Sequence, residues 1–232
     1  MFLTKDNQIK WKKMGVAALI TCVLVMLGIF WFDKPLFVFL RQLNCRLFNW
    51  FDVVFAGKIW LLVSCVAAAV LCVKKYLKSE ISVDFKNWRA SVINCFNKTK
   101  TSHAFLIFYS VLSAGVLVKV LKTFIGRARP IFFEALDMTG FFPPSLDWAF
   151  NSMPSGHTAI SFAGLVMIGM LAPKFKVFTW TLAILIGVSR VAVGAHWPSD
   201  VILGAFIGMV IADIIKSQLL KKTGSILVYA IS

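Results

Sequence analysis

Groups that bind metals or form disulfide frameworks are scarce in this sequence. Its five Cys residues are an odd number, and no two of them form a Cys-x-x-Cys pair. Cys22, Cys65 and Cys72 fall within apolar runs, whereas Cys45 and Cys95 fall in connecting segments. The sequence therefore predicts neither a disulfide nor a metal site, and we expect no cofactor.

A cleavage signal is also missing after the first apolar run. This run begins near Met14, behind Lys10, Lys12 and Lys13, and so has the charge pattern of a secretory signal peptide. No small-x-small cleavage site follows it, because the run continues into the bulky residues 31–33. We therefore interpret the run as a retained membrane anchor.

Charged residues are few, and hydrophobic residues dominate the composition. Of the 232 residues, 15% are charged and 59% are hydrophobic, and the mean hydropathy is +0.81. This hydropathy lies above the range of soluble proteins. The net charge of +15 could suggest a nucleic-acid partner. However, the basic residues are dispersed and flank the apolar runs, as the positive-inside rule explains, so we expect a lipid bilayer partner and no nucleic acid.

The apolar runs predict an all-α, polytopic membrane protein with a single domain over residues 1–232. Runs of this kind cross a bilayer as helices that rise about 1.5 Å per residue. We expect a bundle of six transmembrane helices at residues 14–32, 59–73, 104–121, 158–172, 177–195 and 199–215.

The segments between these runs give three further expectations. Residues 33–35, Asp-Lys-Pro, are expected to close the first helix. In residues 35–56, apolar side chains recur at helical spacing among polar ones, which predicts an amphipathic helix lying in the membrane interface. Residues 131–156 are expected to form a loop, and residues 74–103 are the most polar stretch.

Three short polar clusters stand at the ends of apolar runs. Ionisable groups at membrane depth are costly, and they mark candidate functional sites. Together the clusters supply three cations, two histidines and one carboxylate, a set that suits binding an anion with several oxygens and breaking a bond to it. The clusters are Lys122 with Arg129-Pro130; Pro154-Ser155-Gly156-His157; and Ser189-Arg190 with His196 and Asp200.

The distribution of charge predicts where these clusters lie. Six spans place both termini on one side of the membrane. Most Lys and Arg residues fall on that side, in residues 1–13, 74–103 and 174–176 and in the tail, so we expect cytoplasmic termini. The ends of spans three and five and the start of span four, which carry the clusters, then meet at the outer face.

The clusters resemble the signature of the type 2 phosphatidic acid phosphatase (PAP2) superfamily. That signature is Lys, six residues, Arg-Pro; then Pro-Ser-Gly-His; then Ser-Arg, five residues, His, three residues, Asp. All three spacings occur here in order, across residues 122–200. The resemblance implies a metal-independent lipid phosphatase, a hydrolase of the bacterial inner membrane, whose site opens at the outer leaflet toward the periplasm or exterior.

The resemblance also implies a role for each matching residue. His196 would be the nucleophile and form a phosphohistidine, His157 would protonate the leaving oxygen and then activate water, and Asp200 would fix the tautomer of His196. The residue types suit these roles independently. The phosphate would be bound by Lys122, Arg129, Ser155, Gly156 and Arg190.

Other polar residues have simpler interpretations. We expect Lys119 and Arg127 to be interfacial anchors whose stems reach along the bilayer. His103 lies on the predicted cytoplasmic side and is expected to be structural. Taken alone, Ser155 could be an ordinary helix cap and Asp200 a capping carboxylate.

The substrate and the class of reaction remain open at this stage. Candidate substrates are undecaprenyl pyrophosphate, phosphatidylglycerol phosphate, phosphatidic acid and lipid A phosphate. The same motifs occur in transferases that pass the phosphoryl group to a second lipid. A non-catalytic lipid or anion transporter is a further alternative, because intramembrane cations can line an anion pathway. The sequence does not predict an oligomeric state.

Overall fold

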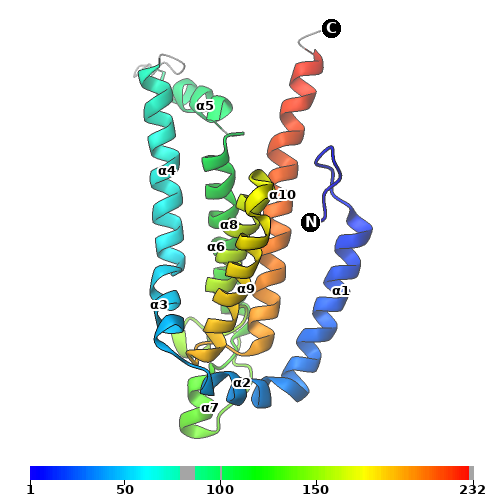
Figure 1. Ribbon diagram of the computed structural model, residues 1–232, viewed down its shortest axis with the longest axis vertical. Coiled ribbons are helices and arrows are strands. Elements are labelled where there is room, and N and C mark those ends of the chain that lie inside the picture. The colour runs from blue at the N-terminus through cyan, green and yellow to red at the C-terminus, as the bar shows by residue number, and fades with distance from the viewer. Residues whose placement is uncertain (79–86, 100, 230–232) are drawn as a thin grey trace.

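The regular structure of this chain is helical wherever the computed structural model describes it, which is over residues 1–78, 87–99 and 101–229. The predicted all-α class is therefore confirmed (Figure 1). The helices are α1 (Trp11–Leu27), a π-helical segment (Gly28–Phe32), α2 (Asp33–Gln42), α3 (Arg46–Val54), α4 (Gly57–Leu77), α5 (Trp88–Thr99), α6 (His103–Ile125), α7 (Pro130–Leu136), α8 (Gly156–Leu171), α9 (Lys176–Ala192) and α10 (Pro198–Tyr229).

Helix α8 forms the centre of the bundle. It packs against α4, α6, α9 and α10, and most of its side chains are buried. Small residues allow this close approach: a Cβ on Gly208 of α10 would lie 2.4 Å from the carbonyl oxygen of Ala159, and one on Gly164 would lie 2.7 Å from the ring of Trp60. Small residues at helix contacts are typical of membrane bundles.

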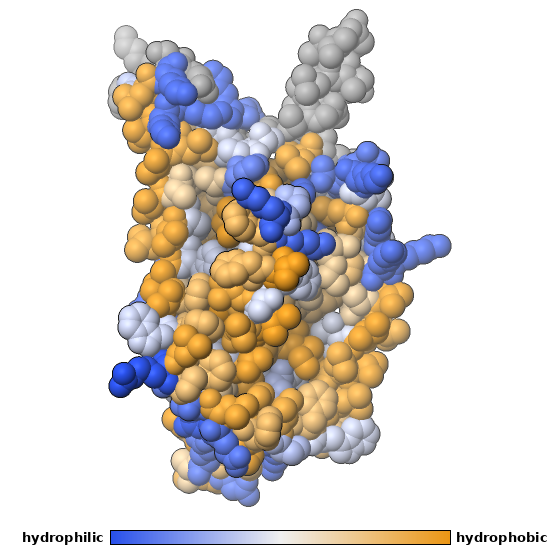
Figure 2. Space-filling view, in the orientation of Figure 1, coloured by the Kyte–Doolittle hydropathy of each residue, from blue (hydrophilic) through white to orange (hydrophobic). Residues whose placement is uncertain are grey.

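Several helices have the length and hydropathy of membrane spans. Among the described residues, five such stretches occur: Trp11–Gln42, Gly57–Leu77, His103–Ile125, Pro173–Ala192 and Pro198–Leu220. Helix α8 has 16 residues and is therefore only about 24 Å long. On the face that Figure 2 shows, apolar side chains cover the middle of the molecule, while hydrophilic residues gather toward its two ends. The prediction of a multi-pass membrane protein is confirmed, with α8 as a shorter helix at its core.

The N-terminal third differs from the prediction in two ways. Residues 33–35 do not close the first helix but form the first turn of α2, where a proline is tolerated. The chain changes direction through the π-helical segment, a common site of helix bends. The expected single amphipathic helix over residues 35–56 is two helices, α2 and α3, broken at residues 43–45.

The segment expected to be a loop, residues 131–156, contains regular structure. Helix α7 begins at Pro130, a residue suited to the first helical position, and a 3-10 turn covers Trp148–Phe150. The polar stretch 74–103 contains the end of α4, all of α5 and the start of α6, and residues 79–86 and 100 within it lie outside the described residues.

The segments that carry the polar clusters meet at one end of the bundle. In Figure 1 this is the lower end, where α6 stops, α8 starts, and α9 connects to α10. Helices α2, α3 and α7 lie at the same end. The C-terminal end of α10 lies at the opposite end, so the clusters are separated from it by the length of the bundle.

Candidate active site

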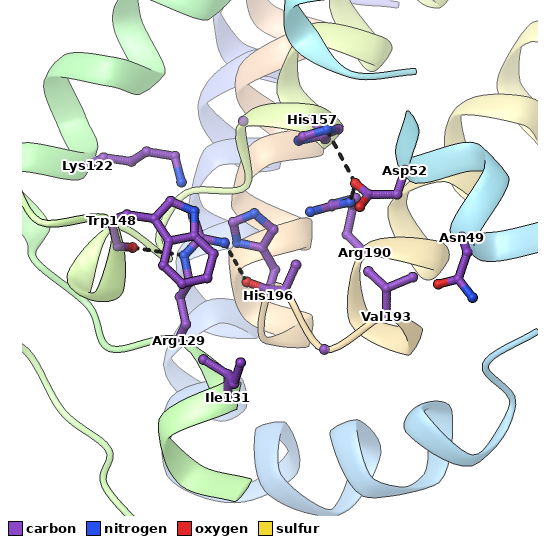
Figure 3. Close-up of a pocket in the computed structure, with 13 residues that line it drawn as sticks. Asn49, Asp52, Lys122, Arg129, Ile131, Trp148, His157, Arg190, Val193 and His196 are labelled. Carbon is purple, nitrogen blue, oxygen red and sulfur yellow. Dashed lines mark hydrogen bonds and ion pairs between the residues drawn. The ribbon is translucent and has the colours of Figure 1, made fainter. Parts of the chain in front are cut away.

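The three clusters converge on one pocket of about 530 Å³ (Figure 3). Helix α6 and the segment after it, the start of α8, and the end of α9 with its connection to α10 each contribute to the wall. Of the predicted site residues, the pocket is lined by Lys122, Arg129, Gly156, His157, Arg190 and His196.

Two predicted residues lie behind the pocket wall. Ser155 is fully buried, and its hydroxyl accepts a hydrogen bond from the Thr158 hydroxyl at 2.9 Å. Asp200 is also fully buried, and its backbone carbonyl accepts from the Ser155 amide at 2.9 Å. This contact joins the start of α8 to α10. The neighbouring Gly204 allows it, because a Cβ there would lie 2.6 Å from the Ser155 carbonyl oxygen.

The guanidinium of Arg129 is held in a fixed orientation. Its nitrogens donate to the carbonyls of Trp148 at 2.9 Å, Ala195 at 3.0 Å and Asn151 at 3.3 Å. The guanidinium also lies over the Trp148 ring, 4.2 Å from its centroid (Figure 3). Burial lowers the pKa of Arg129 to about 10, so the side chain stays charged at neutral pH. The bonds to these carbonyls hold the positively charged guanidinium in a fixed position at the pocket.

Lys122 and Arg190 supply the other two cations. Lys122 lies in the last turn of α6, and its ammonium donates to the carbonyls of Asn151 and Ser152. Arg190 is 5% exposed, and within the described chain its Nε has no hydrogen-bond partner. A buried, unsatisfied guanidinium N–H beside a pocket favours an anionic ligand with oxygen acceptors.

His196 lies beside Asp200, but within the described chain its Nδ1 has no hydrogen-bond partner, whereas the sequence predicts a bond to this carboxylate. Its Nδ1 lies 3.7 Å from Oδ2 of Asp200, and the imidazole is 2% exposed. The same Oδ2 accepts from the Ser152 hydroxyl at 2.5 Å and from the Trp197 amide at 2.9 Å. Burial lowers the pKa of His196 well below its usual value; the Asp200 carboxylate opposes the shift, and the three pocket cations add to it. The imidazole is therefore neutral and can act as a nucleophile.

His157 lies in the first turn of α8 on another side of the pocket, and it faces a residue that the sequence did not point to. Asp52 Oδ1, from α3, lies 3.5 Å from Nε2 of His157 and forms an ion pair with Nη1 of Arg190 (Figure 3). Asn49, one helical turn earlier, also lines the pocket. The sequence held a signal, since Asp52 is the single acidic residue in the amphipathic segment 35–56.

The expectation for Arg127 was wrong. Its side chain is 7% exposed and forms ion pairs with Asp33 and Asp200, whereas an interfacial anchor would reach to solvent. Burial opposes its charge, but the Asp200 and Asp33 carboxylates outweigh burial and raise the pKa of Arg127. No sequence signal links Asp33 to Arg127, because 94 positions separate them.

Comparison with protein families agrees with this geometry. The family model of the PAP2 superfamily matches residues 103–223. The chain belongs to the PAP2 superfamily. The matched region covers about half of the chain and contains all three clusters. The earlier helices, including α3 with Asp52, precede the matched region.

Two proteins are similar in sequence to parts of this PAP2 chain. A lipid A 1-phosphatase of Rhizobium johnstonii is 43% identical over 102 residues, which cover 44% of this chain and 42% of that protein. An undecaprenyl-diphosphatase of Sulfolobus acidocaldarius is 34% identical over 136 residues, covering 56% of this chain and 61% of that protein. The chain thus matches less than half of the length of the Rhizobium relative.

A solved structure resembles the fold. The crystal structure of Aquifex aeolicus LpxE matches with a TM-score of 0.53 and 23% identity, over 81% of this chain and 96% of that chain. At this identity the likeness concerns the helical architecture. It extends beyond the PAP2 match at residues 103–223 and so includes helices outside it.

Proposed function

We propose that this protein is an integral membrane lipid phosphatase that releases inorganic phosphate from a lipid headgroup through a phosphohistidine intermediate. The observation that carries the proposal is the convergence of His196, His157 and three cations on one pocket, with Asp200 facing the Nδ1 side of His196. The names of the relatives support the same class, because one acts on a lipid A phosphate and another on undecaprenyl diphosphate.

The first chemical step is attack on phosphorus. Nε2 of His196 attacks, because its Nδ1 faces the Asp200 carboxylate, which stabilises the imidazolium that develops. The bond from phosphorus to the lipid oxygen breaks, and His157, which becomes protonated when the anionic phosphate group enters the pocket beside it, gives a proton to that oxygen. Lys122, Arg129 and Arg190 stabilise the negative charge on the remaining phosphoryl oxygens.

The second step returns the enzyme to its starting state. His157, now neutral, takes a proton from a water molecule as that water attacks the phosphohistidine. The bond between phosphorus and His196 breaks, and inorganic phosphate leaves. The substrates that fit are lipids with a phosphomonoester or diphosphate at headgroup level: undecaprenyl pyrophosphate, phosphatidylglycerol phosphate, phosphatidic acid or lipid A phosphate.

The proposed location is the bacterial inner membrane, with the pocket on the periplasmic or external side and the termini in the cytoplasm. The distribution of Lys and Arg residues supports this orientation. The pocket lies at the end of the bundle away from the C-terminal end of α10, which is consistent with it.

Phosphate release by purified protein tests the proposal. We expect wild type to release phosphate from at least one of the four lipids, and His196→Ala to lose about a thousandfold or more of this activity, as when a covalent nucleophile is removed. His103→Ala is the matched control. His103 begins α6, at the far end of that helix from Lys122, so this variant should stay active.

Two outcomes would overturn the proposal. Phosphate release by His196→Ala at the wild-type rate would exclude the nucleophile. Transfer of the phosphoryl group to a second lipid, without release of inorganic phosphate, would show a transferase instead of a hydrolase.

A further inference from the structure

A buried chain of charges runs from the first long helical stretch to the catalytic histidine. The guanidinium of Arg127 bridges two carboxylates: Nη2 lies 2.6 Å from Oδ2 of Asp33, and Nη1 lies 2.6 Å from Oδ1 of Asp200. The three side chains are 7%, 3% and 0% exposed. Asp33 begins α2, Arg127 follows α6, and Asp200 lies in the first turn of α10. Three distant segments therefore share one ion cluster.

Ser199 closes this cluster. Its hydroxyl donates to Oδ2 of Asp33 at 2.6 Å and accepts from Nη1 of Arg127 at 2.7 Å. Its backbone amide donates to Oδ1 of Asp33 at 2.9 Å. Both oxygens of Asp33 therefore have hydrogen-bond partners. These bonds fix the carboxylate that holds Nη2 of Arg127.

The two oxygens of Asp200 have different tasks. Oδ2 faces Nδ1 of His196 at 3.7 Å, whereas Oδ1 accepts from Arg127. Rotation of the carboxylate would remove Oδ2 from the imidazole, and the bond from Arg127 to Oδ1 opposes this rotation. Arg127 does not itself line the pocket and so does not touch the substrate.

We infer that Arg127 and Asp33 are positioning residues that act through Asp200 on the nucleophile His196, an inference that rests on the proposed function. A buried ion cluster contributes little to stability when compared with apolar side chains of similar volume. The cluster lies directly behind Asp200, and this position gives it a role other than stability. It sets the orientation of Asp200 and the amount of negative charge that His196 meets.

The charges around His196 predict that replacing Arg127 and replacing Asp33 affect the pH dependence of activity in opposite directions. The imidazole is faced by Lys122 from α6, by Arg129, by Arg190 from α9, and by Asp200 from α10. Replacing Arg127 with Met removes the guanidinium that partly neutralises the Asp200 carboxylate. The full negative charge of Asp200 then favours protonated His196. The acid limb of the profile of kcat/KM against pH then moves to higher pH. Replacing Asp33 with Asn keeps Arg127 beside Asp200, so the acid limb stays in place or moves to lower pH.

Kinetic measurements on these variants test the inference. The substrate is phosphatidic acid in mixed micelles, or another of the four lipids if wild type hydrolyses that one instead. We expect Arg127→Met to lower kcat by about tenfold to a hundredfold, as for residues that orient a metal-bound histidine from behind, with KM within about threefold of wild type. Arg127→Lys should recover part of kcat, because it restores a cation without the fork. Arg89→Met, an exposed arginine in α5, is the matched control and should behave as wild type.

A double variant separates this role from a merely structural one. Because Asp33 acts through Arg127, the variant Asp33→Asn/Arg127→Met should show the acid limb of Arg127→Met alone. Equal loss of kcat in both single variants, with no shift of the acid limb in either, would overturn the inference. If Arg127→Met does not fold, Arg127→Gln, which also removes the cation, takes its place: an acid limb moved to higher pH supports the inference, and an unmoved acid limb with wild-type kcat overturns it.

His196→Ala distinguishes failure of the inference from failure of the proposed function. If His196→Ala is active, the phosphohistidine route is wrong, whatever the Arg127 variants do. If His196→Ala is inactive while Arg127→Met has the wild-type acid limb and kcat, the route stands and the positioning role is wrong.

Discussion

His196 is the residue on which the proposed chemistry depends, and its surroundings set the form in which it reacts. It is enclosed by three cations and one carboxylate, and Arg127 in turn neutralises part of that carboxylate. A nucleophilic imidazole must be neutral, and burial, aided by the three cations, keeps it so by lowering the pKa of His196. In the proposed mechanism, the cations that bind the phosphate thus also help to keep the nucleophile neutral.

The dependence of activity on pH tests this point. The free histidine pKa is about 6.5, and burial, together with Lys122, Arg129 and Arg190, lowers the pKa of His196 below it. His196 therefore stays neutral as the pH falls through 6.5 and loses activity only at lower pH. We expect the acid limb of kcat/KM, corrected for ionisation of the substrate phosphate, to have its midpoint below 6.5. A midpoint at or above that value would contradict a buried, cation-flanked nucleophile.

At the scale of elements, α3 brings a carboxylate into a pocket built for anions. Asp52 meets Arg190 and His157 where a phosphoryl oxygen would bind. If the proposed function holds, the carboxylate competes with phosphate for the same partners. Its helix lies outside the region that defines the family match, so this contact is a property of the N-terminal segment.

Removal of this carboxylate should strengthen binding of inorganic phosphate. Asp52→Asn is expected to lower the inhibition constant for phosphate by about fivefold, equivalent to about 1 kcal/mol for the loss of one repulsive charge near the protein surface. Asp137→Asn is the matched control, because Asp137 is an exposed carboxylate after α7, and Asn tolerates its left-handed backbone. An unchanged or higher inhibition constant for Asp52→Asn would show that the carboxylate does not compete.

The contact between α8 and α10 holds the two halves of the site together. Gly208 lies where any Cβ would meet the Ala159 carbonyl at 2.4 Å. We expect Gly208→Ala to destabilise the protein by about 1–3 kcal/mol through overpacking, measured as a lower midpoint of thermal unfolding in detergent. Gly15→Ala, where nothing lies within 4 Å of the added methyl, is the control. Equal midpoints in the two variants would contradict the packing described.

The apolar runs could be predicted from the sequence because long apolar segments with few charges have few alternatives to a membrane helix. The motifs that line the pocket could be predicted because their spacing is local. The contacts of Arg127 and Asp52 could not, since each joins segments far apart along the chain. The continuation of the helical chain through residues 33–35 was also missed, because Asp33 and Pro35, typical of a helix end, are equally compatible with a first helical turn.

At the scale of the whole molecule, the pocket lies at one end of an apolar bundle, beside the amphipathic helices α2 and α3. Apolar side chains on or between these helices, among them Phe39, Leu43 and Leu47, are exposed. A lipid whose headgroup reaches the pocket would keep its chains in the bilayer next to this surface.

This arrangement predicts a difference between lipid and soluble substrates. Replacing Phe39, Leu43 and Leu47 with Asp should reduce turnover of a lipid phosphate far more than turnover of a soluble phosphate ester, by about tenfold or more for three exposed apolar contacts. The matched control replaces Val23, Val63 and Val66, exposed apolar residues in α1 and α4, with Thr. Equal loss on both substrates would contradict a role for this surface in lipid access.

The central claim is that His196 carries the phosphoryl group between the lipid and water. The most direct measurement is isolation of the phosphorylated protein after brief reaction with a lipid that carries radiolabelled phosphate, followed by mapping of the labelled residue. The account predicts label that is stable to alkali and labile to acid, as for a phosphohistidine. It also predicts that the label maps to His196, is absent from His196→Ala and persists longer in His157→Ala. Label on another residue, or phosphate release by His196→Ala at the wild-type rate, would contradict it.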